Sequence, residues 1–301
     1  MFNSESKLRI DRVVQTIFLL IGILCASVIV FIVVFILAKG IRPFVSTYAN
    51  GEKASFIKFI SSTSWTTETF GVLGMAINTL YLTILSIVIA SPISIFTALF
   101  IVRIAPKKLG ASMQMVVELL ASIPSIVFGL FGMGVINPLS KSIAQLFNVQ
   151  TAGGMSGLST VIVLIMMMLP TITMLSITSM KAVKPDQIQA SLALGATKAQ
   201  TDFKIVIGGA KSGIFAAIIL GVGRALGEAT AVSMVCGNAS EGPNFNLFST
   251  TRTLTSTMMM GFHEASGLEY DIKFSIGIVL IIIILITNVT LNYIKRRMER
   301  I

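Results

Sequence analysis

The stretch 214–236, IFAAIILGVGRALGEATAVSMVC, is long and apolar enough to lie in a bilayer, yet it contains the two charged residues Arg224 and Glu228. About 20 apolar residues in a helix cross the roughly 30 Å hydrocarbon core of a membrane. A charged side chain at that depth is costly, so it is expected to face protein or water and to have a function. This stretch therefore predicts a transmembrane helix that carries functional side chains.

The composition extends this interpretation to the whole chain. Its 301 residues are 54% hydrophobic and 12% charged, with a mean hydropathy of +0.89, whereas soluble domains are about 25% charged. Apolar runs of spanning length occur at 13–38, 72–101, 113–136, 158–180, 214–236 and 274–293. We therefore expect an all-α membrane protein with six transmembrane helices.

The basic residues predict the orientation of these helices. With the N-terminus inside, 15 of the 23 lysines and arginines fall in cytoplasmic segments, as the positive-inside rule requires. They are Lys7, Arg9, Arg12, Arg103, Lys107, Lys108, Lys181, Lys184, Lys198, Lys204, Lys211, Lys295, Arg296, Arg297 and Arg300. We expect both termini in the cytoplasm, and we attribute the net charge of +10 to topology rather than to nucleic-acid binding.

The chain divides into two expected parts. Residues 1–70 form an N-terminal transmembrane helix and an external loop, and residues 71–301 form a core of five transmembrane helices. The first apolar run is longer than the h-region of a signal peptide, which has about 7 to 15 residues. We therefore expect this helix to be a retained anchor.

The longest cytoplasmic connection, between the fourth and fifth apolar runs, contains a short amphipathic helix. Pro185 is typical of a helix start, Ile188, Leu192 and Ala196 recur at helical spacing, and Gly195 is expected to end or bend the helix. Such a helix can dock in the groove of another protein. The alternative is that it lies on the lipid surface.

Catalytic motifs are missing from the sequence. His263 is the only histidine, which excludes an H-E-x-x-H zinc helix, and there is no G-x-S-x-G motif. The segment GGAKS at 208–212 lacks the glycine that precedes lysine in a phosphate-binding P-loop. We expect that the chain is not an enzyme, does not itself hydrolyse ATP and binds no cofactor or metal.

The charges in the fifth apolar run allow two interpretations. Arg224 and Glu228 are four residues apart and are expected on one helix face, while Gly223 and Gly227 form a G-x-x-x-G that lets another helix approach. The two charges either neutralise each other as a buried pair or serve transport. A guanidinium suits bidentate oxyanion recognition, so in the second interpretation Arg224 leaves its carboxylate when a polyanion arrives.

A second polar stripe is expected in the third apolar run. Glu118, Ser122 and Ser125 would lie on roughly the same face, with Pro124 loosening the backbone. Glu118 is either a second resting partner for the arginine or a charge that repels anions, and the sequence does not choose. The expected substrate path comprises Arg224, Glu228, Glu118, Ser122 and Ser125.

The order of these motifs resembles the permease subunits of ABC importers. The segment QASLALGAT at 189–197 resembles their "EAA" coupling loop, with Gln189 where the family usually has glutamate. The segments ELLASIPSIVFG at 118–129 and GRALGEATAV at 223–232 resemble phosphate-specific permeases, more closely the PstC type than its PstA partner. The match covers about residues 78–301.

This resemblance implies a MetI-like fold in a bacterial cell membrane, with residues 71–301 as the permease core and a coupling helix near 185–204. It implies import of inorganic phosphate by alternating access, driven by ATP hydrolysis in a separate subunit. The residues expected to couple to that subunit are Gln189, Ala190, Ser191, Leu192, Gly195 and Ala196.

The resemblance also implies partners embedded in or bound at the membrane: a second, PstA-like permease, two PstB-like ATP-binding subunits and a PstS-like extracytoplasmic phosphate-binding protein. Within this class, the alternatives are the PstA-type partner itself or a permease for another oxyanion, such as sulfate or molybdate. Outside it, the alternative is an anion channel without an ATPase.

Overall fold

The computed structural model describes residues 4–48, 51, 53–66 and 69–299, and the side chains of these residues from 11 to 298. Of the basic side chains that predict topology, those of Lys7, Arg9 and Arg300 lie outside the described part. The described backbone is helical, with connecting loops and isolated bridges in place of strands. This confirms the all-α prediction.

The helices follow one another with few long connections. The α-helices are α1 (Ser4–Val45), α2 (Phe56–Ser61), α3 (Leu73–Leu99), α4 (Lys107–Ser122), α5 (Ser125–Phe131), α6 (Asn137–Leu146), α7 (Gly157–Lys181), α8 (Pro185–Ala193), α9 (Lys198–Thr201), α10 (Ile207–Gly227), α11 (Thr230–Val235), α12 (Leu254–Met259) and α13 (Gly267–Glu299). Short π-helical segments are η1 (Phe100–Ile104), η2 (Gly132–Ile136) and η3 (Asp202–Val206).

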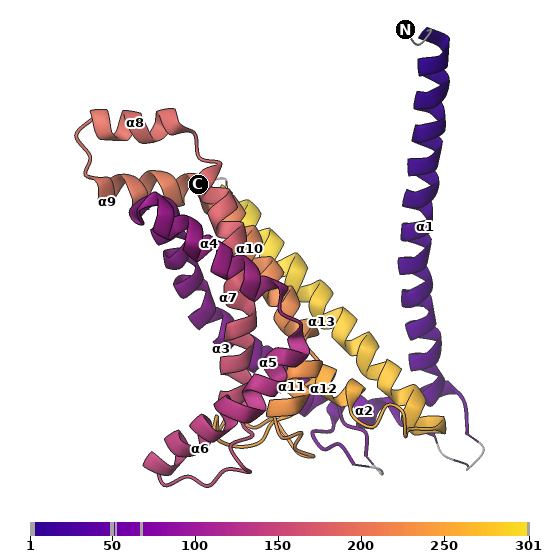
Figure 1. Cartoon of the computed structure of the whole chain (residues 1–301). Coiled ribbons are helices and arrows are strands. Elements are labelled where there is room, and N and C mark those ends of the chain that lie inside the picture. Colours follow the sequence, from indigo (N-terminus) through magenta and orange to yellow (C-terminus); the bar gives the residue numbers. More distant parts are fainter. Residues whose placement is uncertain (1–3, 49–50, 52, 67–68, 300–301) are drawn as a thin grey trace.

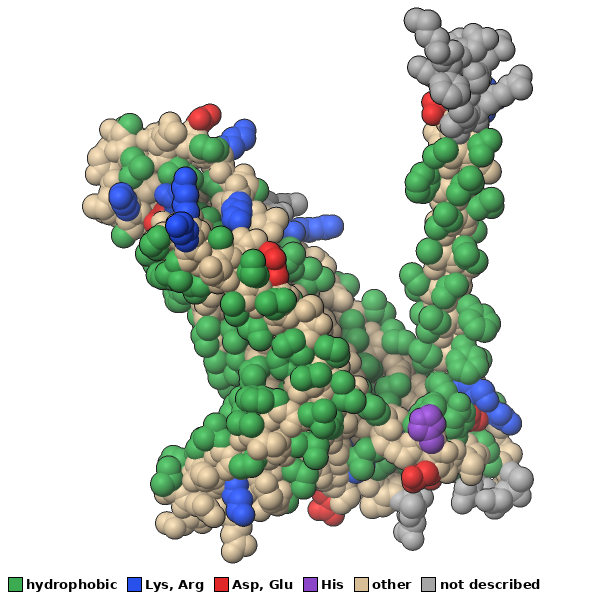
Figure 2. Space-filling model, in the orientation of Figure 1, with side chains coloured by type: hydrophobic (Ala, Val, Ile, Leu, Met, Phe, Trp, Pro, Cys, Tyr) green, Lys and Arg blue, Asp and Glu red, His purple; other side chains and the backbone are tan. Residues whose placement is uncertain are grey.

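Six helical stretches of the described chain are long and apolar enough to cross a membrane, as the sequence predicts. They are Asp11–Val45, Leu73–Ile104, Ser125–Leu146, Gly157–Lys181, Lys198–Gly227 and Gly267–Met298. Figure 1 shows both chain ends and α8 at one end of the molecule, which we call the α8 end. Hydrophobic side chains cover the length of the helices, and lysines and arginines gather at the α8 end (Figure 2).

The predicted bounds of two spans are wrong. The third lies at Ser125–Leu146 instead of 113–136, because the helix ends at Ser122 and residues Ile123 and Pro124 are extended. The residue before a proline disfavours the helical region, so Pro124 separates two helices instead of loosening one. The fifth lies at Lys198–Gly227 instead of 214–236, because α10 ends at Gly227.

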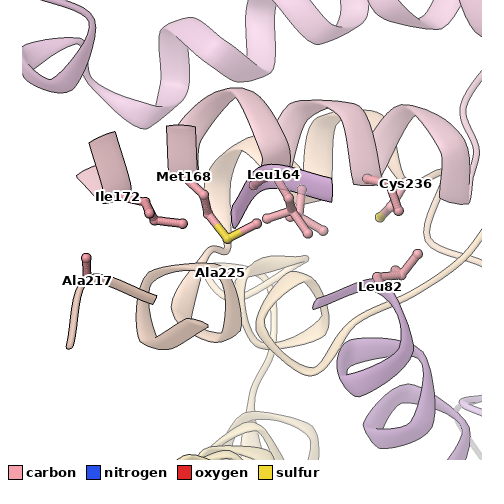
Figure 3. Close-up of a cluster of buried hydrophobic side chains, with 10 residues drawn as sticks. Leu82, Leu164, Met168, Ile172, Ala217, Ala225 and Cys236 are labelled. Carbon is pink, nitrogen blue, oxygen red and sulfur yellow. The ribbon is translucent and has the colours of Figure 1, made fainter. Parts of the chain in front are cut away.

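Helix α7 is the centre of the bundle and packs against α3 and α10. Figure 3 shows Met168 and Ile172 of α7 pointing toward Ala217 and Ala225 of α10, and Leu82 of α3 belongs to the same buried cluster. Met168 and Ile172 are 0% exposed. The small alanines let the α10 backbone approach, and the larger α7 side chains fill the space. The methionine run of α7 thus contributes packing, as an adaptable apolar side chain can.

Helix α1 leans away from the bundle and meets α13 only near its C-terminal end (Figure 1). Gly40 lies against α13 so closely that a Cβ there would be 2.6 Å from Cδ1 of Ile278 and 2.8 Å from the carbonyl of Phe274. The Ser275 hydroxyl donates a hydrogen bond of 2.6 Å to the Gly40 carbonyl. Nearer the N-terminus of α1, a Cβ at Gly22 would meet no atom within 4 Å.

A charged cluster joins the same two helices. Asp271 of α13 is buried and accepts a hydrogen bond of 2.6 Å from the Tyr48 hydroxyl. Its carboxylate oxygens lie 3.6 Å from Nζ of Lys39 and 3.6 Å from Nη1 of Arg42. Burial and the hydrogen bond to Asp271 raise the pKa of Tyr48 above its ordinary value, so the phenol remains a donor.

We expect Gly40→Ala to destabilise the contact between α1 and α13, because the added methyl group overlaps the α13 backbone. Overpacking of this kind costs roughly 1–3 kcal/mol. Gly22→Ala is the matched control on the same helix and should keep stability equal or raise it slightly, because alanine favours a helix over glycine and meets no atom there. The measurement is the thermal unfolding midpoint of the purified protein in one detergent, and equal midpoints for the two variants would contradict the described packing.

Candidate functional site

The site is built around a break in the helical backbone at Glu228. Helix α10 ends at Gly227, and Glu228 takes the extended values φ −75° and ψ 114° before α11 begins. The Glu228 side chain turns to this break, and its Oε1 accepts a hydrogen bond of 3.0 Å from the amide of Ala231. Its carbonyl accepts a hydrogen bond of 2.7 Å from the Thr255 hydroxyl. Glu228 is 9% exposed, so these bonds replace its contact with water.

Arg224 therefore does not share a helix face with Glu228. The ion pair expected between these two residues is absent from the described part of the chain. Nη1 of Arg224 instead donates a hydrogen bond of 2.7 Å to the Thr171 hydroxyl of α7. No described carboxylate lies within 4.0 Å of this guanidinium, which is partly exposed in the isolated chain. A guanidinium has five N–H donors, so Arg224 keeps donors available for an acceptor from outside.

The glycines on either side of Arg224 face open space. A Cβ at Gly223 or Gly227 would meet no atom within 4 Å, whereas a Cβ at Gly221 would lie 2.9 Å from Cδ1 of Ile172. Gly221 thus packs against α7 within this chain, whereas Gly223 and Gly227 of the G-x-x-x-G pattern make no such contact. The face of α10 next to Arg224 is free to take another helix, water or a small solute.

The second expected stripe does not join this site. Glu118 lies in α4, outside the six spanning stretches, and is exposed. It accepts a hydrogen bond of 2.8 Å from Gln114, whose Oε1 accepts one of 2.8 Å from Lys181. Ser122 ends α4 and Ser125 begins α5, so they do not share a helix face. No described hydrogen bond or ion pair connects these residues to Arg224.

The short helix predicted in the longest connection is present as α8, which begins at Pro185. Gly195 follows it with φ +84° and no atom within 4 Å of a Cβ position. This left-handed conformation favours glycine, which explains why the helix stops there. Gln189 and Ala190 are exposed, so the outer face of α8 is open to a partner.

The other predicted coupling residues hold α8 on its support or extend its open face. Ser191 shares a hydrogen bond of 2.9 Å with Thr201 of α9. Leu192 is exposed and Ala196 is partly buried. Leu194, at the end of the helix, is 89% exposed. An apolar side chain that exposed in a polar region is suited to insertion into another protein.

Three contacts were not expected from the sequence. Thr171 and Thr255 reach Arg224 and Glu228 from other helices, and no local pattern identifies them. Below α8, Nε of Arg103 in η1 lies 2.6 Å from Oδ1 of Asp202 in η3. This ion pair joins the end of α3 to the segment that carries α8 and α9 into α10.

These features define a multi-spanning membrane protein with a cation in one of its spanning stretches and a short, largely exposed helix at one end. The family described as "Binding-protein-dependent transport system inner membrane component" matches residues 90–300. The chain belongs to this family, and it is a permease subunit of an ABC importer in the cell membrane.

Relatives of this chain are named as permeases. It is 36% identical over 272 residues to a probable ABC transporter permease protein, YqgH, of Bacillus subtilis, covering 88% of this chain and 84% of that one. It is 32% identical over 279 residues to the phosphate transport system permease protein PstC 2 of Mycobacterium tuberculosis, covering 86% and 84%. It is also 32% identical over 248 residues to PstC of Pasteurella multocida, covering 78% and 76%.

Solved structures show the same fold. A bacterial ABC transporter for import of the acidic polysaccharide alginate has a chain that superposes with a TM-score of 0.65 at 17% identity, covering 96% of this chain and 99% of that one. The MetNI methionine ABC transporter in an inward-facing conformation has a chain with a TM-score of 0.55 at 17% identity, covering 75% and 94%. The predicted MetI-like fold is therefore confirmed.

We expect Glu228→Leu to destabilise the protein and Glu228→Gln to be tolerated. Glutamine keeps an oxygen that can accept from the Ala231 amide, whereas leucine leaves this buried donor without a partner, at a cost of about 1–3 kcal/mol. Thermal unfolding of the two purified variants measures the difference. Equal losses in both would show that the charge of Glu228, rather than its acceptor oxygen, stabilises the break.

Proposed function

We propose that this chain is the PstC-type permease of an importer for inorganic phosphate. The observation that carries the proposal is Arg224: a guanidinium at membrane depth that contacts a neutral hydroxyl and lies next to the open glycine face of α10. Bidentate donation to an oxyanion is the chemistry for which arginine is best suited. The relatives named PstC support phosphate as the oxyanion.

In this proposal, the α8 end faces the cytoplasm and both termini lie there. The exposed face of α8 docks on a PstB-like ATP-binding subunit, and a second such subunit docks on a PstA-like permease. A PstS-like binding protein delivers phosphate at the opposite end. Hydrolysis of ATP takes place in the ATP-binding subunits, and this chain contributes no catalytic residue and no cofactor.

The contacts of Arg224 suggest how phosphate passes. Phosphate oxygens replace the Thr171 hydroxyl as acceptors, so the arginine exchanges a neutral partner for a charged one without breaking an ion pair. Glu228 remains bonded to Ala231 and Thr255. Glu118, Ser122 and Ser125 are assigned no contact with phosphate in this state. In the alternating-access cycle, movement of α8 biases the bundle between two states, which is the physical content of such coupling.

We expect Arg224→Gln to reduce phosphate uptake by about tenfold or more, the effect of losing a hydrogen bond to a charged group worth about 1.5–3 kcal/mol. Arg224→Lys should also impair uptake, because an ammonium lacks the planar fork. The measurement is uptake of labelled phosphate by cells that carry each variant and its partner subunits, with complex assembly checked by purification.

The matched control is Thr171→Val, which removes the resting acceptor of Arg224 and keeps its charge. This variant should retain uptake. Normal phosphate uptake by an assembled Arg224→Gln complex would remove the arginine from the mechanism. Uptake of labelled sulfate in place of phosphate by the intact complex would reassign the substrate.

We expect Gly195→Val to weaken attachment of the ATP-binding subunit, because a β-branched residue is strained at φ +84° and should distort the end of α8. Gly195→Asn is the control, since asparagine tolerates this conformation. Co-purification of the ATP-binding subunit with each variant gives the result. Equal recovery of that subunit with both variants would argue against docking through this end of α8.

A further inference from the structure

A second cationic site lies at the end opposite α8, away from Arg224. A cleft of about 320 Å³ opens there between the segment before α3, the turn after α12 and the start of α13. Its lining includes Thr66, Arg252, Thr257, Glu269 and Lys273. Thr66 and Glu269 are exposed and mark its rim. The two basic side chains lie deeper.

Arg252 is held in place by only part of its donor set. Nε and Nη2 donate hydrogen bonds of 3.2 and 2.7 Å to the carbonyl of Asn238. Nη1 has no hydrogen-bond partner among the described residues. Burial lowers the pKa of Arg252, but an arginine stays protonated in proteins. The Asn238 carbonyl thus orients the guanidinium through Nε and Nη2, and Nη1 stays available to a ligand.

Lys273 is the second cation and is only 3% exposed. Its Nζ donates a hydrogen bond to the carbonyl of Met260, the residue that ends α12. A lysine on the last carbonyls of a helix is a stabilising arrangement, so this contact alone has a structural explanation. An ammonium has three donors, however, and the described contacts with neutral acceptors use one.

The charges of the cleft are not balanced by close pairing. No described carboxylate lies within 4.0 Å of Arg252 or Lys273. Glu269 at the rim is the one acidic residue among the described lining residues, against two cations, and Glu264 nearby is exposed. Buried charges are normally paired, and two like charges in one shielded cleft repel each other. A bound anion would relieve both costs.

We propose that this cleft is an outer binding site for a phosphate oxyanion, held by Arg252 and Lys273. Resting on the proposed function, the inference adds a first stop for phosphate before Arg224. The two sites are joined by one short element. Arg252 immediately precedes the Thr253 cap of α12, and Thr255 within α12 donates to the Glu228 carbonyl at the helix break.

The test is direct binding of inorganic phosphate to the assembled complex, purified without its binding protein and without nucleotide. Binding is measured by the broadening of the phosphorus NMR signal of the phosphate. Arg252→Gln and Lys273→Gln should each weaken binding by about tenfold or more, as expected for loss of a hydrogen bond to a charged group. Thr66→Glu should also weaken it by placing a carboxylate at the rim. Thr66→Gln, of the same size and neutral, should not.

Arg224→Gln separates this inference from the proposed function. It should reduce uptake by about tenfold or more and leave phosphate binding at the cleft unchanged, whereas loss of binding in Arg224→Gln but not in Lys273→Gln would overturn the outer site. Unchanged binding in both Lys273→Gln and Thr66→Glu would overturn it as well. If Arg224→Gln transports normally while Lys273→Gln fails to bind, the outer site stands and the path through Arg224 does not.

A phospholipid headgroup carries the same phosphate chemistry, so the titration is made in lipid discs and in detergent. Equal binding of free phosphate in both supports the outer site. Binding seen in detergent but not in lipid discs would show that a headgroup occupies the cleft, and it would overturn the assignment to free phosphate.

Discussion

At Glu228 the chain leaves a membrane-depth helix, and every consequence for the site follows from how the freed polar groups are satisfied. In lipid, an unpaired backbone group costs several kcal/mol, so a broken helix is tolerated only where protein or water supplies partners. Here the carboxylate accepts from the Ala231 amide and Thr255 donates to the carbonyl. The acid that could have neutralised Arg224 is thereby used to hold the backbone.

The open side of the molecule follows from the same arrangement. Because α7 packs its large side chains against the small ones of α10, Gly221 is enclosed while Gly223 and Gly227 face outward with Arg224 beside them. A partly exposed guanidinium is a poor surface to present to lipid. In the proposed importer, a second permease subunit therefore covers this face, so that the guanidinium meets protein or water instead of lipid.

The sequence predicts what local signals determine. Run length identifies six spans, and Pro185 with Gly195 delimits α8, because hydrophobic length and backbone conformation are properties of short segments. The break at Glu228 has no proline to mark it and depends on Thr255 from another helix. Pro124 was visible, but the sequence does not show whether it bends a helix or separates two. The common helix face predicted for Glu118, Ser122 and Ser125 is therefore wrong, because α4 ends at Ser122 and α5 begins at Ser125.

Coupling between the two ends requires elements that move as units, and the contacts suggest which ones they are. At the α8 end, the ion pair of Arg103 and Asp202 ties α3 to the segment that carries α8. At the other end, α12 links Arg252 to the break at Glu228. The rigid packing of α7, α3 and α10 lies between them. A ligand at either end can shift the bundle only by binding its two states unequally, and in the proposed cycle a phosphate held by Arg224 or Arg252 would supply that difference.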